Sequence, residues 1–516
     1  MSAPRKEWLG LSIAVAVYCV LRALILHTAF DATAMPQYEL FPMGTIAQLA
    51  GVDGGLPVTR VYDNAAGQLV TGFAAWPLFA VFGHSYLALK LVPCALGLVT
   101  LVCLWLTLRR PFGLAAANIG ALLFALGPTT LVKYSLMASG NHFENLCFTA
   151  LALCCFVRMH ALGVSGARLA ATGAACGFAI FVFLGAFTPV ALIAATHLGL
   201  RGWKSTLHDA LAAGTGFALG VAPLVAINYV TGGRGFAFLD DKFGGKDTGF
   251  DLARIGTRLR EFFVEHLPAA GQYEDFLGLS GRTVGLVFLA LFALAYLYLL
   301  PEALSASWQL VRGVFGRGAL DARNAELGRF VTAPLLVYLP LTALAYSLTN
   351  LKIAPYAHPV ECGGYRYFNL HLMFACVLIA IAAARLLARR ALAGRLLAGA
   401  ALATGLANIA LVDLRFAKTG LGAYYLGYNF DQCANQLVTP RNGYSQGEIV
   451  AMVESYRPAL RPVLYAGLGR ARANYQAIKS RGDLAVLDLG AVLEPFAPAH
   501  RAEVARGFGE FVRNTA

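Results

Sequence analysis

The sequence predicts an α-helical polytopic membrane protein, and its composition is the first observation behind that prediction. Of its 516 residues, 58% are hydrophobic and only 13% are charged. A soluble globule cannot bury that much apolar surface, so most of it needs hydrocarbon to face. The second observation is run length. A spanning helix needs about 20 predominantly apolar residues, and about eleven such runs recur along the chain.

The runs follow one another from the N-terminus to residue 414. They cover residues 8–30, 85–108, 111–136, 143–162, 169–187, 189–200, 211–230, 284–300, 330–348, 370–387 and 396–414. The first is too long for a signal-peptide core and lacks a convincing cleavage site, so we expect it to remain as an anchor. We therefore predict a transmembrane domain of residues 1–414 with outer loops 31–84, 231–282 and 350–369.

The third observation is where the basic residues lie, since the net charge of +13 could suggest a nucleic-acid partner. They gather between alternate runs, at Arg5, Lys6, Arg109, Arg110, Arg158, Arg168, Arg201, Lys204, Arg312, Arg317, Arg323, Arg329, Arg385, Arg389, Arg390 and Arg395. By the positive-inside rule this side is cytoplasmic. The N-terminus is then cytoplasmic, and an odd number of spans places the C-terminus outside the cytoplasm. The charge indicates topology, and we expect no nucleic-acid partner.

The first outer loop carries the acidic residues that matter most. Residues 31–68 contain only one basic residue, Arg60, but supply Asp31, Glu39 and Asp63. The apolar stretch at residues 68–83 is too short to cross a bilayer comfortably, and we expect a helix lying at the outer membrane surface. Such a helix would hold the carboxylates at the height of the lipid headgroups.

A second polar segment, KYSLMASGNHFEN, brings Lys133, His142 and Glu144 to the mouths of two spans. Ionisable groups at membrane depth are costly to bury, so their presence favours a cavity that uses them. His142 and Glu144 could converge on a ligand or metal from a loop. Equally, Asn141 could be the N-cap of the next helix, with Glu144 at the third helical position. The two interpretations are compatible.

Two later outer segments add positive charge. Residues 252–263 place apolar side chains at helical spacing with arginines elsewhere, which is typical of a helix at a membrane surface or of a packed loop helix. Residues 350–369 contain prolines and glycines that prevent regular structure. There Lys352, Arg366 and Tyr367 offer donors to an anion such as phosphate. Arg366 could instead extend to the headgroups.

The order of these features resembles the GT-C superfamily of polyprenyl-phosphate-sugar glycosyltransferases, in the bacterial branch of protein mannosyltransferases and aminoarabinose transferases. The matching stretches are YELFPMGTIAQLAG, FAAWPLFAVFGHSYLALKLVPCALG, LTLRRPFGLAAANIGALLFALGPTTLVKYSLMASG and YRYFNLHLMFA. The resemblance implies a GT-C-like bundle in a bacterial-type cytoplasmic (inner) membrane. It also implies an enzyme that transfers a hexosyl or pentosyl group.

The resemblance also implies roles for individual residues. The acidic pair of the family falls on Tyr38 and Glu39, so only Glu39 is retained, and Asp31 competes with it for the role of catalytic base. Donor phosphate would be bound by Arg366 and Tyr367, with Lys352 or Lys133 assisting. Some relatives need a divalent cation. Here its ligands, or contacts to the acceptor, would be Asp63, His142 and Glu144.

The implied reaction is an inverting transfer at the outer face of the membrane. The partners would be a lipid-linked sugar donor and an envelope glycan, lipid or protein acceptor. A carboxylate would take the proton of the acceptor, and preorganised cations would stabilise the phosphate leaving group.

From residue 415 onward the spans stop and charges of both signs increase, which predicts a small, mainly helical extracytoplasmic domain at residues 415–516. Two stretches in it share the spacing R-x-x-[LV]-x-x-G-[LF]-G, beginning at Arg461 and Arg501. The glycines of such helical units would permit close helix packing. LAVLDLG, at residues 484–490, is either a strand or a short helix.

Two alternatives to an enzyme remain open. A noncatalytic GT-C-like scaffold or subunit would explain the loss of the acidic residue at Tyr38. A polytopic transporter would gather ionisable residues at the bilayer midplane. Here Arg22 and Lys90 are the ionisable residues inside spans, and we expect both to extend toward the headgroups. The sequence specifies neither the sugar nor the acceptor.

Overall fold

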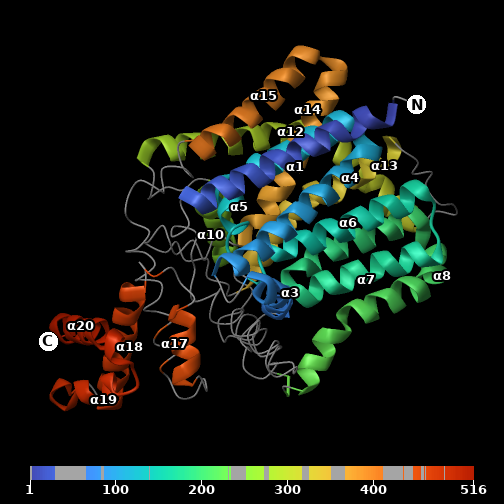
Figure 1. The fold of residues 1–516 in the computed structure, drawn as a ribbon. Coiled ribbons are helices and arrows are strands. Elements are labelled where there is room, and N and C mark those ends of the chain that lie inside the picture. Colours follow the sequence, from blue (N-terminus) through green and yellow to red (C-terminus); the bar gives the residue numbers. More distant parts are fainter. Residues whose placement is uncertain are drawn as a thin grey trace.

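The computed structural model is almost entirely helical in the part of the chain that it describes (Figure 1). It describes residues 3–28, 66–82, 86–138, 140–230, 232–233, 252–271, 278–315, 325–349, 367–410, 445–454, 461–480 and 483–515, together with residues 434, 438 and 458. No strand occurs in these ranges. The predicted class of α-helical polytopic membrane protein is confirmed.

The helices follow the predicted apolar runs closely. The first group is α1 (Ala3–Thr28), α3 (Ala66–Phe82), α4 (Tyr86–Leu126), α5 (Thr129–Tyr134), α6 (Glu144–Leu162), α7 (Gly166–Val182), η3 (Leu184–Ala186) and α8 (Phe187–Val230). The second group is α10 (Leu252–Arg260), η4 (Glu261–His266), α11 (Leu267–Gly271), α12 (Gly278–Phe315), α13 (Ala325–Leu348), α14 (Asn369–Arg389) and α15 (Ala391–Asn408). The predicted helices at residues 68–83 and 252–263 correspond to α3 and to α10 with η4.

Two of these helices reverse direction at a single glycine. In α4, Trp105 donates to Asn118 Oδ1 at 2.8 Å, although 13 residues of straight helix would separate them by about 20 Å. The reversal lies at Gly113, whose φ is 84°. In α8, Gly202 has a φ of 72° and plays the same part. Positive φ is a conformation that glycine adopts without steric cost.

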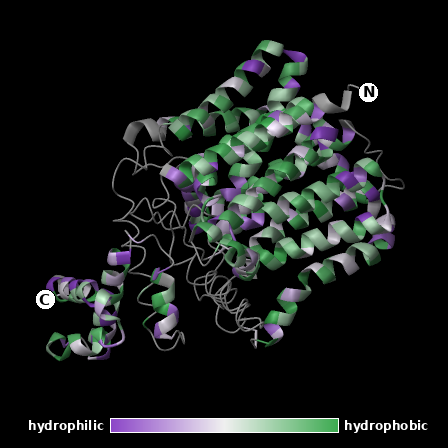
Figure 2. Cartoon of the chain, viewed as in Figure 1, coloured by the Kyte–Doolittle hydropathy of each residue, from purple (hydrophilic) through white to green (hydrophobic). Residues whose placement is uncertain are grey.

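Eight helical stretches within the described residues are long and apolar enough to cross a membrane. Two of them contain the reversals of α4 and α8, and two further apolar helices, α3 and α7, are shorter. Most of the predicted runs lie on one helix or on one side of a reversal, as far as they are described. Residues 111–136 instead extend across Gly113 and the end of α4 into α5, and residues 169–187 extend from α7 through η3 to the start of α8. How many of them cross the bilayer completely stays a prediction. Figure 2 shows hydrophobic residues along the bundle helices and hydrophilic ones gathered toward their ends.

The bundle has two ends of different chemistry. We call one the arginine end, because Arg109, Arg201, Arg329 and Arg385 lie there with the start of α1. We call the other the amide end, because α6 and α14 begin there with Asn145 and Asn369. The last turn of α15 is also at the amide end, since Gly405 lies against Leu126 at the end of α4. The chain thus enters and leaves the bundle at opposite ends.

The packing of α7 against the second part of α8 depends on paired glycines. Gly173 and Gly177 of α7 lie against the α8 backbone, and Gly216 and Gly220 of α8 lie against the α7 backbone. Both pairs have the G-x-x-x-G spacing that brings helices close together in membranes. Since α7 and residues 203–230 run in the same direction, the intervening residues 187–201 must run in the opposite direction.

The last group of helices is α17 (Gln446–Glu454), α18 (Arg461–Lys479), α19 (Leu489–Leu493) and α20 (Pro498–Thr515) (Figure 1). Their buried apolar residues share one hydrophobic cluster with residues of α3 and α4. Gly469 of α18 lies against Val504, and Gly507 of α20 lies against Ala466, so the two helices are antiparallel and in close contact. This is the close packing expected from the glycine pattern. The LAVLDLG stretch forms a 3₁₀ turn, η10 (Leu484–Val486), and then begins α19. The boundary of the unit at residue 415 stays a prediction.

Candidate functional site

Polar groups at the arginine end pair with one another. Asp209 accepts from Arg201 Nε at 2.9 Å and lies 3.1 Å from His197 Nε2, and the other nitrogen of His197 is 3.1 Å from His160 Nε2. Arg109 pairs with Glu7. Arg329, near the start of α13, and Arg385, near the end of α14, both pair with Glu302. Polar groups that satisfy one another in this way stabilise the packing of the helices at this end.

The two cations inside the spans near the amide end have a different role from the one predicted. Arg22 is 3% exposed and Lys90 is 0% exposed, so neither reaches toward the headgroups. Arg22 donates to Ser135 Oγ at 3.1 Å and to the carbonyl oxygen of Ala125. Lys90 donates to the carbonyl oxygen of Leu136 at 2.7 Å. They bind carbonyls at the ends of helical segments, where the helix dipole favours cations.

These cations fix the turn between α5 and α6, which was the second predicted polar segment. Glu144, 0% exposed, accepts from the backbone N–H of Gly140 at 2.8 Å. Gly140 has a φ of 79°, and a Cβ there would lie 2.7 Å from Gln68 at the start of α3. The helix begins at Glu144 itself, with Phe143 as N-cap. The predicted capping box at Asn141 is therefore wrong in register, although Glu144 does satisfy a backbone donor.

His142 and Tyr367 connect the starts of α6 and α14. Their rings meet edge to face with centroids 4.7 Å apart, and the ring of Phe183 also contacts His142, with centroids 4.6 Å apart. Lys133 is 5% exposed on α5, which packs against α14. Two segments predicted independently, residues 133–145 and the end of 350–369, thus meet in space. Of the predicted phosphate ligands, Tyr367 lies at this meeting point, and Lys133 lies on the adjacent helix α5.

Sequence reasoning missed two further residues in the same place. Asn145 is 0% exposed and Asn369 is 1% exposed, and neither side-chain amide makes a hydrogen bond within the described part of the chain. Each lies in the first turn of its helix. The signal available from sequence was a strongly polar residue just inside an apolar run. Such residues are expensive in a membrane and are often functional.

The remaining predicted site residues are Asp31, Glu39, Asp63, Lys352 and Arg366, and all five lie outside the described residues. Their roles stay predictions. Of the three predicted cation ligands, Glu144 already has one oxygen engaged by the Gly140 amide. No group of three His, Cys, Asp or Glu side chains within the described ranges could hold a metal.

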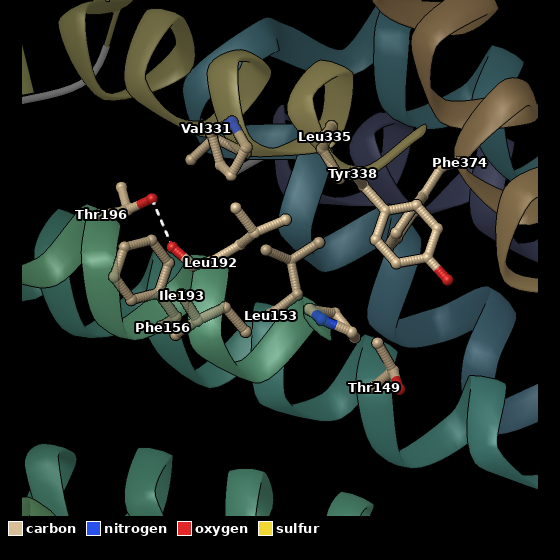
Figure 3. A pocket seen from close by; sticks show the side chains of 12 residues that line it. Thr149, Leu153, Phe156, Leu192, Ile193, Thr196, Val331, Leu335, Tyr338 and Phe374 are labelled. Atoms are coloured by element: carbon tan, nitrogen blue, oxygen red, sulfur yellow. Dashed lines mark hydrogen bonds between the residues drawn. The ribbon is translucent and has the colours of Figure 1, made fainter. Parts of the chain in front are cut away.

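A small apolar pocket lies inside the bundle (Figure 3). It lies between α6, α8, α13 and α14, with Thr149 and Tyr338 near one end and Thr196 at the other (Figure 3). Between them the lining is aliphatic or aromatic, at Leu153, Phe156, Pro189, Leu192, Ile193, Val331, Pro334, Leu335 and Phe374. Thr149 is one helical turn from Asn145, so the polar and apolar surfaces adjoin.

No protein-family model matches the sequence, and none of the curated proteins compared with it is significantly similar. Several solved structures resemble the fold. The archaeal oligosaccharyltransferase AglB from Archaeoglobus fulgidus, in complex with an inhibitory peptide and a dolichol-phosphate, is 14% identical with a TM-score of 0.46, covering 85% of this chain and 59% of that one. The Archaeoglobus fulgidus oligosaccharyltransferase in complex with Zn and sulfate is 14% identical with a TM-score of 0.44, covering 84% and 55%.

A third structure is ArnT from Cupriavidus metallidurans bound to undecaprenyl phosphate. It is 15% identical with a TM-score of 0.43, covering 84% of this chain and 81% of that one. The present chain spans 55 to 60% of the length of the archaeal enzymes. At this level of likeness, neither the activity nor the ligands of those proteins carry over to this chain.

Proposed function

We propose that this multi-pass membrane protein is an inverting glycosyltransferase. It moves a sugar from a polyprenyl-phosphate donor to an envelope acceptor at the outer face of the cytoplasmic membrane. The observation that carries the proposal is the contrast between the two ends of the bundle. At the arginine end, carboxylates accompany the described ion-paired arginines. At the amide end, buried cations lie beside buried amides that make no hydrogen bond within the described residues.

A donor of this class matches the chemistry of the amide end. The described partners of Arg22 and Lys90 are uncharged oxygens, so the positive charge of these side chains still favours an anion nearby. A phosphate diester offers that anion. The small pocket one turn below Asn145 has an almost wholly apolar lining, which is the chemistry that an isoprenoid chain requires because it carries no hydrogen-bonding group. The sugar would lie beside the amides. The phosphate, the isoprenoid chain and the sugar of the donor would thus each meet a different kind of surface.

The proposed reaction is a single displacement. A carboxylate, Glu39 or Asp31, removes the proton of the acceptor hydroxyl or amine, and the acceptor atom forms a bond to the anomeric carbon. The bond from that carbon to the phosphate oxygen breaks, and its electron pair stays on the phosphate. Arg366, with Lys133, Lys352 and Tyr367, stabilises the developing charge. One displacement inverts the configuration at the sugar carbon.

The test is a transfer assay with purified protein and a panel of polyprenyl-phosphate hexoses and pentoses. We compare the wild type with Glu39→Gln and Asp31→Asn, and with Glu326→Gln as a matched control. Glu326 is an exposed residue of the arginine end that pairs with Arg329, and such surface pairs contribute about 1 kcal/mol or less. We expect one outer-loop variant to lose turnover while still binding donor, and the control to keep it.

Other outcomes separate the alternatives. If no donor is turned over but polyprenyl phosphate still binds, the noncatalytic scaffold is favoured. Movement of the lipid or a solute across vesicles without sugar transfer would favour the transporter. Adding EDTA to the same assay tests the divalent cation that Asp63 and His142 would bind. Turnover that both carboxamide variants retain would overturn the proposed base.

A further inference from the structure

Among the described residues, the two asparagines at the amide end have the most buried side-chain atoms without a hydrogen bond. All four side-chain amide atoms of Asn145 and Asn369 are buried without a hydrogen bond in the described part of the chain, and so is the hydroxyl of Thr149. A buried polar group without a partner costs about 1–3 kcal/mol. Most buried polar groups in proteins are paired, so each exception needs an explanation.

The two amides belong to one place. Asn145 follows His142 by three residues and Asn369 follows Tyr367 by two, and the His142 and Tyr367 rings are in contact. Helices α6 and α14 pack directly against each other. Neither has a side-chain hydrogen bond from its N-cap residue, which is Phe143 in α6 and Phe368 in α14. The backbone N–H groups of two helix starts therefore adjoin the two amides.

The chemistry of an amide selects its ligand. A carboxamide offers two N–H donors and one acceptor oxygen. A phosphate only accepts, so it would leave Oδ1 of both asparagines unmatched, and an isoprenoid chain would match nothing. A hydroxyl both donates and accepts. Adjacent hydroxyls on one ring would therefore match Asn145 and Asn369 together.

We propose that Asn145 and Asn369 form the subsite that binds the sugar of the lipid-linked donor through its hydroxyl groups. The inference rests on the proposed function. It identifies the part of the site that recognises the sugar, as distinct from the part that binds the phosphate. Thr149, one turn further along α6, extends the same surface toward the pocket. The two asparagines are then specificity-determining residues. They do not take part in proton transfer.

The test compares two probes, undecaprenyl phosphate alone and undecaprenyl phosphate carrying glucose, mannose, galactose or xylose. Binding is measured by thermal melting of the full chain in detergent over a range of lipid concentrations. The variants are Asn145→Leu and Asn369→Leu, which replace the amide with an apolar group of similar size. We expect both to bind undecaprenyl phosphate as the wild type does. They should bind the preferred glycosylated lipid about tenfold more weakly, since one unmatched group is worth about that factor.

A second readout distinguishes recognition from a structural role. Without ligand, the leucine variants should melt at or above the wild-type temperature, because an unmatched buried polar group has been removed. The matched control is Asn228→Leu. Asn228 is 6% exposed on α8, but its Nδ2 already donates to Leu224 at 2.9 Å. We expect this control to leave sugar binding unchanged.

The outcomes separate the inference from the function. If the wild type binds neither probe, both are overturned. The subsite is overturned if the wild type binds undecaprenyl phosphate with the same affinity whether or not it carries a sugar, or if the leucine variants bind the glycosylated lipid as tightly as the wild type does. Either result leaves the proposed function standing. If a leucine variant does not fold, Asn145→Ser and Asn369→Ser make the same comparison. Serine variants that keep the full sugar gain would likewise overturn the subsite.

Discussion

The glycine contact between α7 and α8 gives a prediction whose size follows from the coordinates. A Cβ built on Gly216 would lie 2.7 Å from the carbonyl carbon of Ala170 and nearer still to its oxygen. Real Cβ atoms essentially never approach another heavy atom within 3.0 Å. Because the obstacle is backbone, no side-chain rotation relieves it, and the two helices must separate. Gly216→Ala therefore requires a shift along the whole contact.

The expected cost is that of overpacking a well-packed interior, about 1–3 kcal/mol. Weak Cα–H···O contacts between the helices, worth about 0.5–1 kcal/mol each, are lost as well. We expect the melting temperature of the purified protein in detergent to fall by about 2–5 °C. A fluorescence-based thermal melt measures it, with size-exclusion chromatography to confirm that the variant is monodisperse.

Gly214 in the same helix provides the control. A Cβ on Gly214 would meet no heavy atom within 4 Å, and alanine is a better helix former than glycine by about 0.5–1 kcal/mol. Gly214→Ala should melt at or above the wild-type temperature. Equal melting of the two alanine variants would refute the close approach of α7 and α8.

Two further predictions concern the loops and the C-terminal helices. Burial lowers the pKa of His266 below its ordinary value of 6.5, and this effect outweighs the attraction of the nearby carboxylates. The unfolded chain therefore binds a proton at this position more readily than the folded chain does. The free energy of unfolding should then fall as the pH drops below 6.5. His266→Gln, which can still bond to Tyr346, should flatten melting temperature between pH 7 and 5, and an unchanged slope would assign the effect elsewhere. In α20, a Cβ on Gly507 would lie 2.5 Å from the carbonyl carbon of Ala466, whereas one on Gly509 meets nothing within 4 Å. Gly507→Ala should therefore lower the melting temperature and Gly509→Ala should not, as measured by the same thermal melt.

The fold class could be predicted because it depends on quantities that a single sequence contains. Composition and run length are enough to identify helices in hydrocarbon, and most apolar runs lie on one helix, although residues 111–136 and 169–187 each cover more than one. The reversals of α4 and α8 were predictable as breaks between runs, but not as turns of one residue. That detail depends on Gly113 and Gly202 adopting positive φ, which local sequence does not specify.

The partners of buried polar groups could not be predicted. Arg22 donates to a carbonyl 103 residues away, and Lys90 to one 46 residues away. Both side chains were expected to extend toward the headgroups because the sequence gives only their distance from the ends of the apolar runs. Asn145 was missed for a related reason. An asparagine near a helix start usually indicates a cap, and only tertiary burial distinguishes it from a residue that faces a ligand.

The predicted site was partly recoverable from sequence. Ionisable residues at the ends of apolar runs pointed to residues 133–145, and His142 does meet Tyr367 from the other predicted segment. The capping register around Glu144 was wrong by two positions because helix boundaries depend on the packing of the preceding turn. The predicted bases, Glu39 and Asp31, still depend on the transfer assay.

The single-residue reversals restrict how the bundle can change shape. Helices joined at Gly113, at Gly202 and at Arg390 have almost no spare chain between them at the arginine end. They cannot slide past one another or part at that end, so any change in their spacing must be a tilt about it. The largest displacement then falls at the opposite end, beside Asn145 and Asn369. On the proposed function, the lipid-linked donor would therefore enter and leave beside those two residues.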